Sequence, residues 1–213
     1  VLSLSSFSTE INLIKLDNLE DDGLKLSQDK LHFRDSYFTK LNSALASGFL
    51  LEVSKGAQIE SPVEIIYAHD SDDPALCQSR TTVLLNEGSS VTLLTRTCFK
   101  NNNINLSNSV FEASVKRNAS LTKYNIDNDN YTSPHNQIIN NVFIEQEQRS
   151  KATLYDFSLS GQLVRNNITV CLRGEFASSH LYSTSLLRND AHVDNAIIVN
   201  HLSPNCNLSL IHI

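Results

Sequence analysis

Residues 192–206, HVDNAIIVNHLSPNC, contain the side-chain types that bind metals or carry out acid–base and thiol chemistry. His192, Asp194, His201 and Cys206 lie on either side of the apolar run 196–199. Imidazole, carboxylate and thiolate groups are common metal ligands, and a metal site requires that they converge at short range. These groups could therefore form one site, or they could be the polar edges of one coil in a larger repeating structure.

The alternation of a β-strand separates most of these groups. If the stretch is a strand, His192 and Asp194 share one face and His201 lies on the other, while Cys206 begins a new segment. We therefore expect a structural coil with polar corners, and we predict no catalytic residue. A metal site would need ligands from a neighbouring coil, and its candidate ligands are Cys206, His201 and Cys171.

The cysteine spacing is typical of reduced thiols rather than of a disulfide framework or a zinc motif. The four cysteines are spread thinly, with no CxxC or CxxH: Cys77, Cys98, Cys171 and Cys206. In NITVCL (167–172) the apolar residues share one face, which should point inward, so Cys171 should point outward. The face occupied by Cys98 in VTLLTRTC (91–98) is ambiguous. An outward thiol could accept sulfur or bind a metal, or it could be no more than a small residue on a strand.

The composition excludes several classes of protein. The 213 residues carry a net charge of −6, which argues against a protein that binds nucleic acid through the phosphate backbone. No apolar run is long enough to cross a membrane, and no P-loop motif for nucleotides is present. The chain starts at Val1, has no Met and lacks a signal-peptide pattern, so we interpret it as a fragment of a longer protein.

One helix is predicted near the start of the chain. Within residues 35–47, three apolar residues follow helical spacing: Phe38, Leu41 and Leu45. Asp35 or Ser36 can cap its first turn, and Gly48 is suited to the position just past its end.

After Gly48 the hydrophobic period changes to two and a motif recurs. It consists of a turn residue, a small residue, any residue and an apolar residue, at 56–59, 88–91, 118–121 and 151–154, with a looser copy at 175–178. The first four copies are 32, 30 and 33 residues apart. Short β-rich runs lie between them, at 81–85, 109–115, 140–145, 167–172 and 195–200. A fixed step of this length, in segments rich in Val, Ile, Thr and Asn, predicts a mainly β fold: a parallel β-helix, or β-solenoid, with one short N-terminal helix.

The abundance of asparagine agrees with this prediction. Asparagine tolerates the left-handed conformation needed at coil corners, and its amides can form ladders from coil to coil. The stretch NNNINLSN (101–108) is therefore interpreted as part of the coils and not as a prion-like tract.

An ordered set of motifs resembles the SufD branch of the SufB/SufD family. HVDN (192–195) followed by HLSPNC (201–206) is similar to a family segment that runs His-Val-Asp-Asn, then His-x-x-Pro-x-Cys. GQLVRNNITVCLRGEFA (161–177) resembles a coil of the family, and residues 38–67 resemble its entry helix and first coils. The resemblance covers about residues 37–210.

The resemblance implies a right-handed parallel β-helix and a role in iron–sulfur cluster assembly. In this family, SufD-like proteins pair with SufB through their β-helices, and helical C-terminal domains hold the ATPase SufC. By this resemblance the chain is a non-enzymatic scaffold subunit of a cytoplasmic or plastid-stromal complex. It binds no cofactor alone, and the iron–sulfur cluster forms in the assembled complex.

The sequence also departs from the family pattern. It ends soon after Cys206, before the family's Cys-x-His-Gly-Ala segment and its C-terminal helices, so no cluster-binding residue is carried over. We expect a lead-in segment at 1–36 and a partial β-helix core at 37–213, without the domain that would hold SufC.

A second function remains open, namely a secreted β-helix polysaccharide lyase or adhesin. Lyases of this architecture use carboxylate-bound calcium, and two acidic clusters raise this possibility: Asp70, Asp72 and Asp73, and Asp127 and Asp129. The neighbouring Ser, Pro and Asn residues indicate solvated loops for both clusters.

Overall fold

The period-two segments form strands that stack into two facing sheets. The computed structural model describes residues 9–15, 36–69, 73–99, 104–127 and 135–213. The first sheet contains, in spatial order, β1 (Ile11–Lys15), β2 (Ser47–Val53), β4 (Leu76–Leu85), β6 (Leu106–Val115), β8 (Gln137–Gln146), β10 (Leu163–Leu172) and β12 (His192–His201). The second contains β3 (Val63–His69), β5 (Ser90–Phe99), β7 (Ser120–Asp127), β9 (Lys151–Ser158), β11 (Ser178–Ser185) and β13 (Asn207–His212).

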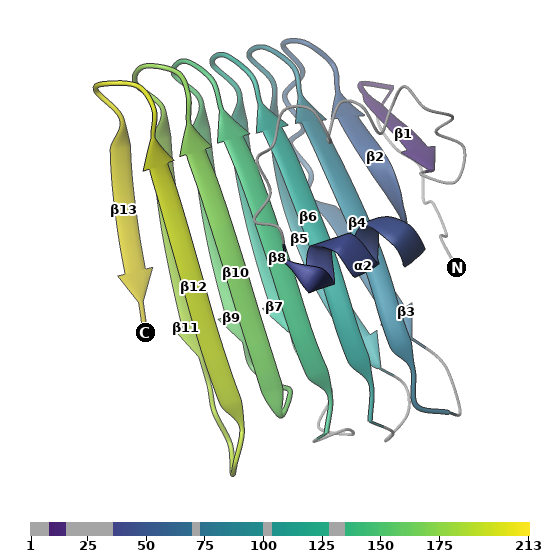
Figure 1. Ribbon diagram of the computed structural model, residues 1–213. Helices are drawn as coiled ribbons and strands as arrows, with labels where there is room; N and C mark the ends of the chain where they lie inside the picture. The colour runs from purple at the N-terminus through teal and green to yellow at the C-terminus, as the bar shows by residue number, and fades with distance from the viewer. Residues whose placement is uncertain (1–8, 16–35, 70–72, 100–103, 128–134) are drawn as a thin grey trace.

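The chain alternates between the sheets, so each coil contributes one strand to each (Figure 1). From β2 onward, neighbouring strands within a sheet are parallel. The described part of the chain is thus a β-solenoid of about five turns with a single short helix, which confirms the predicted fold class. All five β-rich runs identified in the sequence lie in strands of the first sheet.

The core lies between the two sheets and is built from columns of matched residues. One column of the first sheet comprises Leu51, Val83, Ala113, Ile144 and Val170, all at most 1% exposed. Because the coils are in register, each side chain packs on its counterparts one coil above and below. Burying an aliphatic side chain of this size contributes about 1.5–3 kcal/mol, so such columns stabilise the stack.

One corner of every coil is made by a residue in the left-handed conformation. These residues are Gly56, Gly88, Asn118, Arg149, Phe176 and Asn205, with φ between 55° and 75°. The N–H of Gly56 donates to the Glu87 carbonyl of the next coil, and the N–H of Asn118 donates in the same way to Gln148. The first three corners are at the predicted turn residues.

The later corners differ from the prediction. The turn residues of the fourth and fifth copies are Arg149 and Phe176, not Lys151 and Glu175. Lys151 begins β9 and pairs with Ser120, so the apparent fourth motif was out of register by two residues. Because a period-two pattern repeats every two residues, its alternation alone cannot detect such a shift.

Asparagine amides form a ladder on the outer face of the first sheet, as predicted. Asn141 Nδ2 donates to Asn108 Oδ1 and Asn167 Nδ2 donates to Asn141 Oδ1, each at 3.1 Å. Asn108 is the last residue of the predicted Asn-rich stretch, of which residues 101–103 lie outside the described residues.

Helix α2 (Tyr37–Leu45) is the predicted helix, and it lies across the outer face of the first sheet (Figure 1). Ser36 is its N-cap, with Oγ accepting the N–H of Thr39 at 3.1 Å. The expectation that Gly48 follows its end was wrong: the C-cap is Ala46, in an extended conformation, and Gly48 belongs to β2.

The predicted lead-in segment contributes a strand to the first sheet. β1 pairs antiparallel with β2 along the side of β2 that faces away from β4. The rest of this segment, including the acidic stretch 20–22, lies outside the described residues apart from 9, 10 and 36.

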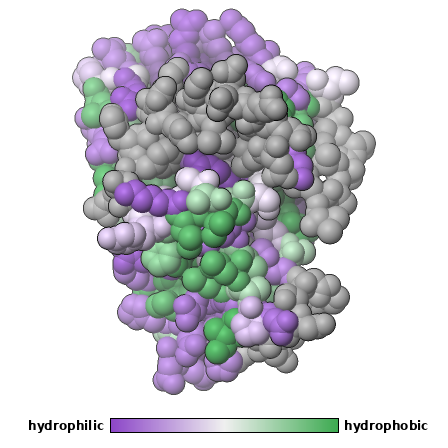
Figure 2. Space-filling view, turned by 45° about the vertical axis from the view of Figure 1, so that its right-hand side comes forward, coloured by the Kyte–Doolittle hydropathy of each residue, from purple (hydrophilic) through white to green (hydrophobic). Residues whose placement is uncertain are grey.

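No helix in the described ranges is long and apolar enough to cross a membrane. On the side of the molecule seen in Figure 2, apolar residues form a patch in the middle of the view, with hydrophilic residues to its left and below it.

Candidate functional site

The structure does not bring the three candidate metal ligands to one point. Cys171 lies on the outer face of the first sheet, as predicted, where its Sγ accepts a hydrogen bond from Asn200 at 3.4 Å. His201 pairs with the fully buried Leu172 and therefore occupies an inward-facing position. Neighbouring positions alternate between faces, so Cys171 and His201 lie on opposite sides of the sheet.

Cys206 occupies the corner position that takes a small residue in every coil. The matching residues are Ala57, Ser89, Ala119, Ser150 and Ala177. The Cys206 thiol donates to the Gly174 carbonyl at 3.3 Å and packs against the edge of the core. The corner position, this hydrogen bond and the packing account for the placement of Cys206 without a metal ligand role.

The remaining groups of the 192–206 stretch are also used within the coil. His192 and Asp194 share the outer face of β12, and Asp194 forms an ion pair with Arg165 of the previous coil. In the part of the chain that the structure describes, no three His, Cys, Asp or Glu side chains are grouped so that they could hold a metal ion. All four cysteines are free, and Cys98 lies outside the core, opposite the buried Thr95 and Thr97.

The most unusual chemistry lies inside the solenoid. Lys123, Asp127 and Asp156 point between the sheets and are only 4%, 1% and 8% exposed. This corrects the expectation that Asp127 belongs to a solvated loop. Asp70, Asp72 and Asp129 lie outside the described residues, and Asp73 is exposed.

Amide groups connect the two buried carboxylates. Asn125 Nδ2 donates to Asp156 Oδ1 at 2.9 Å and to Asp127 Oδ2 at 3.3 Å. From the opposite sheet, Asn140 Nδ2 donates to Asp127 at 2.7 Å and Asn166 Nδ2 donates to Asp156 at 3.1 Å. The carboxylates are thus held by donors from both sheets, which satisfies much of their hydrogen-bonding capacity inside the core.

Burial dominates the electrostatics of this cluster. Burial, together with the adjacent Asp156 carboxylate, raises the pKa of Asp127 to about 7, although Asn140, Lys123 and Asn125 lower it. Burial likewise raises the pKa of Asp156, against the attraction of Lys123. The pKa of Lys123 falls to about 8 because burial disfavours the ammonium, although both carboxylates oppose this. One buried ammonium faces two carboxylates, so protonating one carboxyl group balances the charge.

The polar interior continues to the last coil along a column of asparagines. Asn140 Nδ2 donates to Asn166 Oδ1 at 2.9 Å, and Asn166 Nδ2 donates to Asn195 Oδ1 at 2.8 Å. Asn195 lies 3.4 Å from the ring of His212. His212 Nδ1 in turn lies 3.1 Å from the Ser183 Oγ of the neighbouring coil. The evident effect of the column is to link successive coils.

The alternation in SLTKYNID (120–127) could have revealed this cluster. It places Lys123, Asn125 and Asp127 on the same face as the apolar Leu121. The polar neighbours of Asp127 are typical of a loop, and no motif marks Lys123 or Asp156. Three polar residues on an inward face are a local signal, but their partners in other coils cannot be identified without the register.

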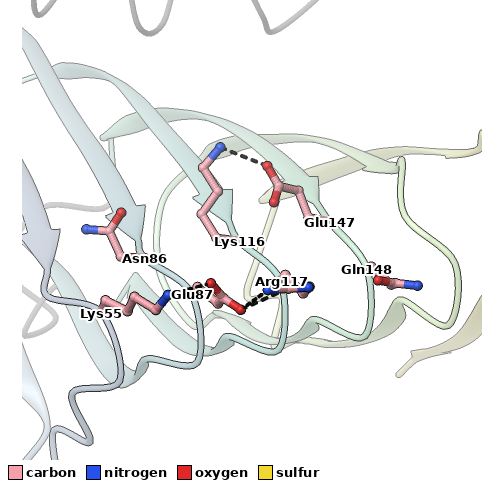
Figure 3. A pocket seen from close by; sticks show the side chains of 7 residues that line it. All are labelled: Lys55, Asn86, Glu87, Lys116, Arg117, Glu147 and Gln148. Carbon is pink, nitrogen blue, oxygen red and sulfur yellow. Dashed lines mark hydrogen bonds and ion pairs between the residues drawn. The ribbon is translucent and has the colours of Figure 1, made fainter.

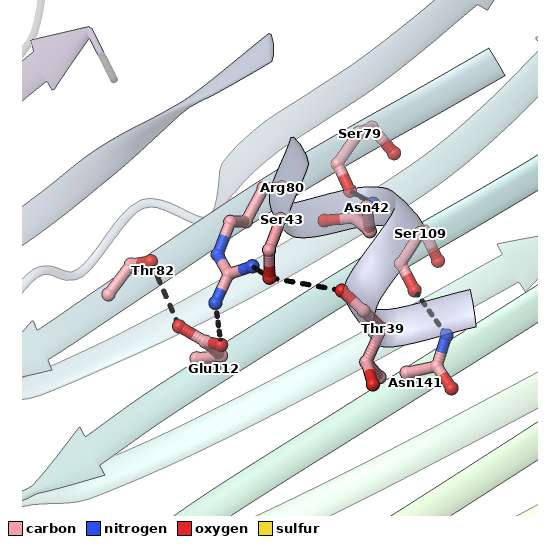
Figure 4. Close-up of polar contacts among 9 residues, drawn as sticks. All are labelled: Thr39, Asn42, Ser43, Ser79, Arg80, Thr82, Ser109, Glu112 and Asn141. Atoms are coloured by element: carbon pink, nitrogen blue, oxygen red, sulfur yellow. Dashed lines mark hydrogen bonds and ion pairs between the residues drawn. The ribbon is translucent and has the colours of Figure 1, made fainter. Parts of the chain in front are cut away.

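A second polar cluster fixes α2 to the first sheet (Figure 4). Asn42 is fully buried, and its Nδ2 donates to the carbonyls of Ser79 and Asn108 at 2.9 and 3.0 Å. Arg80 donates to Ser43 at 3.0 Å and forms an ion pair with the buried Glu112. Burial raises the pKa of Glu112, against the attraction of Arg80.

Beside α2, the outer face of the first sheet forms a groove of about 420 Å³. Its floor is mainly apolar, with Ile139, Phe143 and Ile198 among the lining residues. Arg165 and Asp194 also line the groove, and their ion pair neutralises the two charges.

A shallow pocket at the coil corners is lined by alternating charges (Figure 3). Glu87 lies between Lys55 and Arg117, at 2.9 Å from each, and Lys116 pairs with Glu147 at 2.8 Å. The hydrogen bonds from Lys55 and Arg117 lower the pKa of Glu87. Exposed pairs of this kind contribute little each, and here they align successive corners.

Together, these features define a parallel β-solenoid whose polar groups, inside and at the corners, tie one coil to the next. The family model for the SufBD core domain of the SUF system for FeS cluster assembly matches residues 67–212. The chain therefore belongs to the SufBD core-domain family, which takes part in iron–sulfur cluster assembly within the Suf complex. A comparison with curated proteins finds no match.

Proposed function

We propose that this chain is a SufD-like, non-enzymatic scaffold subunit of a SufBCD-type complex. It pairs with a SufB-like subunit through its β-helix, and its parent protein contacts a SufC-like ATPase through a domain outside this sequence. The iron–sulfur cluster is the cargo of the complex, and the chain alone binds no cofactor. We place the complex in the cytoplasm or in a plastid stroma.

The observation that carries this proposal is the family match over a stack of coils whose polar side chains bond mainly to one another. The 192–195 segment and Cys206 favour a SufD-like over a SufB-like member. The lyase alternative is weakened because Asp127 faces the interior, where Asn125 and Asn140 bind it.

The test uses the full-length parent protein, co-expressed with SufB-like and SufC-like subunits. We expect the wild type to co-purify with both subunits. Failure of the wild type to co-purify, or cleavage of acidic polysaccharide with calcium, would contradict the proposal.

A further inference from the structure

Three tyrosines are stacked on the outer face of the second sheet, one in each of three successive coils. Tyr124 pairs in register with Tyr155, and Tyr155 pairs with Tyr182. The ring centroids of the first pair are 4.7 Å apart with an interplanar angle of 7°, and those of the second pair are 5.0 Å apart at 17°. We call these three residues the tyrosine ladder.

The sheet geometry produces the ladder. Parallel strands lie about 4.8 Å apart, and in-register side chains on one face inherit that spacing. Leu94 and Ile211 occupy the positions next to the ladder in the same column. Each ring therefore has a neighbour held at fixed distance and orientation, which an isolated surface tyrosine lacks.

The ladder is also an accessible group of electron-rich rings. The sequence contains no Trp and no Met, and the three ladder tyrosines are only partly buried, so a small oxidant in solution can reach them. Tyr67 is also partly buried, but its hydroxyl is hydrogen-bonded to Thr81, and desolvation raises its pKa to about 12. Tyr37 is 90% exposed on α2, and Tyr131 lies outside the described residues.

We propose that the tyrosine ladder is a site of covalent oxidative modification, at which one-electron oxidants join neighbouring coils through dityrosine. Each of two adjacent phenols loses one electron to the oxidant and one proton to water, giving two phenoxyl radicals. A carbon–carbon bond forms between their ring carbons ortho to oxygen. The hydrogen on each of those carbons then moves to the phenoxyl oxygen and restores both phenols. Two electrons and two protons leave in total, taken up by two equivalents of oxidant and by solvent.

The bond would add a covalent link to contacts that are otherwise non-covalent. Tyr124 and Tyr182 lie in the first and third of three adjacent coils, with Tyr155 between them. A link at either pair prevents the joined coils from separating. The cross-linked protein should therefore resist unfolding more than the protein without the cross-link. This inference does not depend on the partners in the proposed function.

The experiment uses the intact chain with its thiols alkylated, because the four free cysteines would otherwise compete for the oxidant. A photo-generated ruthenium(III) complex serves as the one-electron oxidant. Monomer is isolated by gel filtration, its dityrosine fluorescence is recorded and its cross-linked peptides are mapped by mass spectrometry. We expect intramolecular links of Tyr155 with Tyr124 or Tyr182.

Two variants make the test specific. Tyr155→Phe keeps the ring but removes the phenol shared by both pairs, and it should abolish dityrosine in the monomer. The control Tyr37→Phe removes the most exposed phenol and should leave the signal unchanged. The proposal is overturned if monomeric dityrosine persists in Tyr155→Phe, if the mapped links join other tyrosines, or if oxidised wild-type monomer contains none.

Discussion

Lys123, Asp127 and Asp156 show how charged residues can be accommodated inside a repeat. The two carboxylates accept hydrogen bonds from their own sheet and from the facing one, and Lys123 Nζ lies 4.9 Å from the ring centroid of Phe111. A buried ion cluster seldom adds stability relative to apolar residues of the same size. The cluster instead helps to fix the register between neighbouring strands, because a slip of one residue would leave these charges without partners.

Asp127 gives folding a pH dependence of definite sign. Its pKa is about 7 in the folded protein against an ordinary 3.8, so the folded state retains a proton that the unfolded chain loses between these values. The stabilising contribution is complete below 3.8 and is lost as pH rises through about 7. For Lys123 the folded pKa is lowered from 10.5 to about 8, so its contribution is present above 10.5 and is lost as pH falls through about 8.

We therefore predict that Asp127→Asn flattens the pH dependence of stability on the acid side of neutrality. Since one pKa unit corresponds to about 1.4 kcal/mol, the wild type should lose on the order of 2–4 kcal/mol more than the variant across this range. Urea unfolding at a series of pH values measures it. Asp190→Asn, which changes an exposed carboxylate, is the control and should retain the wild-type slope. Equal slopes in wild type and Asp127→Asn would contradict this assignment.

At the scale of single elements, α2 binds the sheet by its polar side. Thr39 and Asn42 are its buried residues, whereas Phe38, Leu41 and Leu45 are 40%, 37% and 60% exposed. The apolar spacing was sufficient to predict that this segment is helical. It did not predict which side of the helix is buried, because that is decided by carbonyl groups of Ser79 and Asn108, far away in the sequence.

Removing the Asn42 amide should release α2 while the coils stay folded. Asn42→Ala leaves two buried carbonyls without their side-chain donor, at a cost of about 1–3 kcal/mol. Hydrogen exchange of a peptide spanning 37–45 should therefore accelerate, while exchange in β6 and β8 stays slow. Leu45→Ala, on the exposed side, should change neither. Faster exchange throughout the solenoid in Asn42→Ala would show that α2 is integral to the stack.

The strands were more predictable than the corners that join them. Alternation placed Ile168, Val170 and Leu172 inward and Cys171 outward, as observed, because burial imposes a period of two on any half-buried strand. The predicted positions of the later corners were wrong because Arg149 and Phe176 are not residues that usually adopt a positive φ. At the candidate site, the separation of His201 from Asp194 followed from alternation, but the cluster around Asp156 required the register between coils.

At the scale of the whole molecule, each coil contacts mainly its neighbours, so stability should vary along the stack. Central strands such as β7 and β9 are paired on both sides, whereas β13 is paired only with β11 in the described region. We predict that native-state hydrogen exchange is slowest in β7 and β9 and fastest in β13, since the last coil can open alone. Mass spectrometry of exchanged peptides tests this, and uniform protection from β3 to β13 would contradict it.

The left-handed corner residues also determine how the protein can change length. At one corner of every coil, from Gly56 to Asn205, a residue has φ between 55° and 75°, so residues 118–148 make up one complete circuit of the chain. Excising or duplicating such a circuit would shift the far end by one inter-strand spacing, about 4.8 Å, and leave the remaining junctions equivalent. The length of the stack therefore changes by one inter-strand spacing for each coil gained or lost. Such changes can occur in evolution without substitutions in the core of the remaining coils.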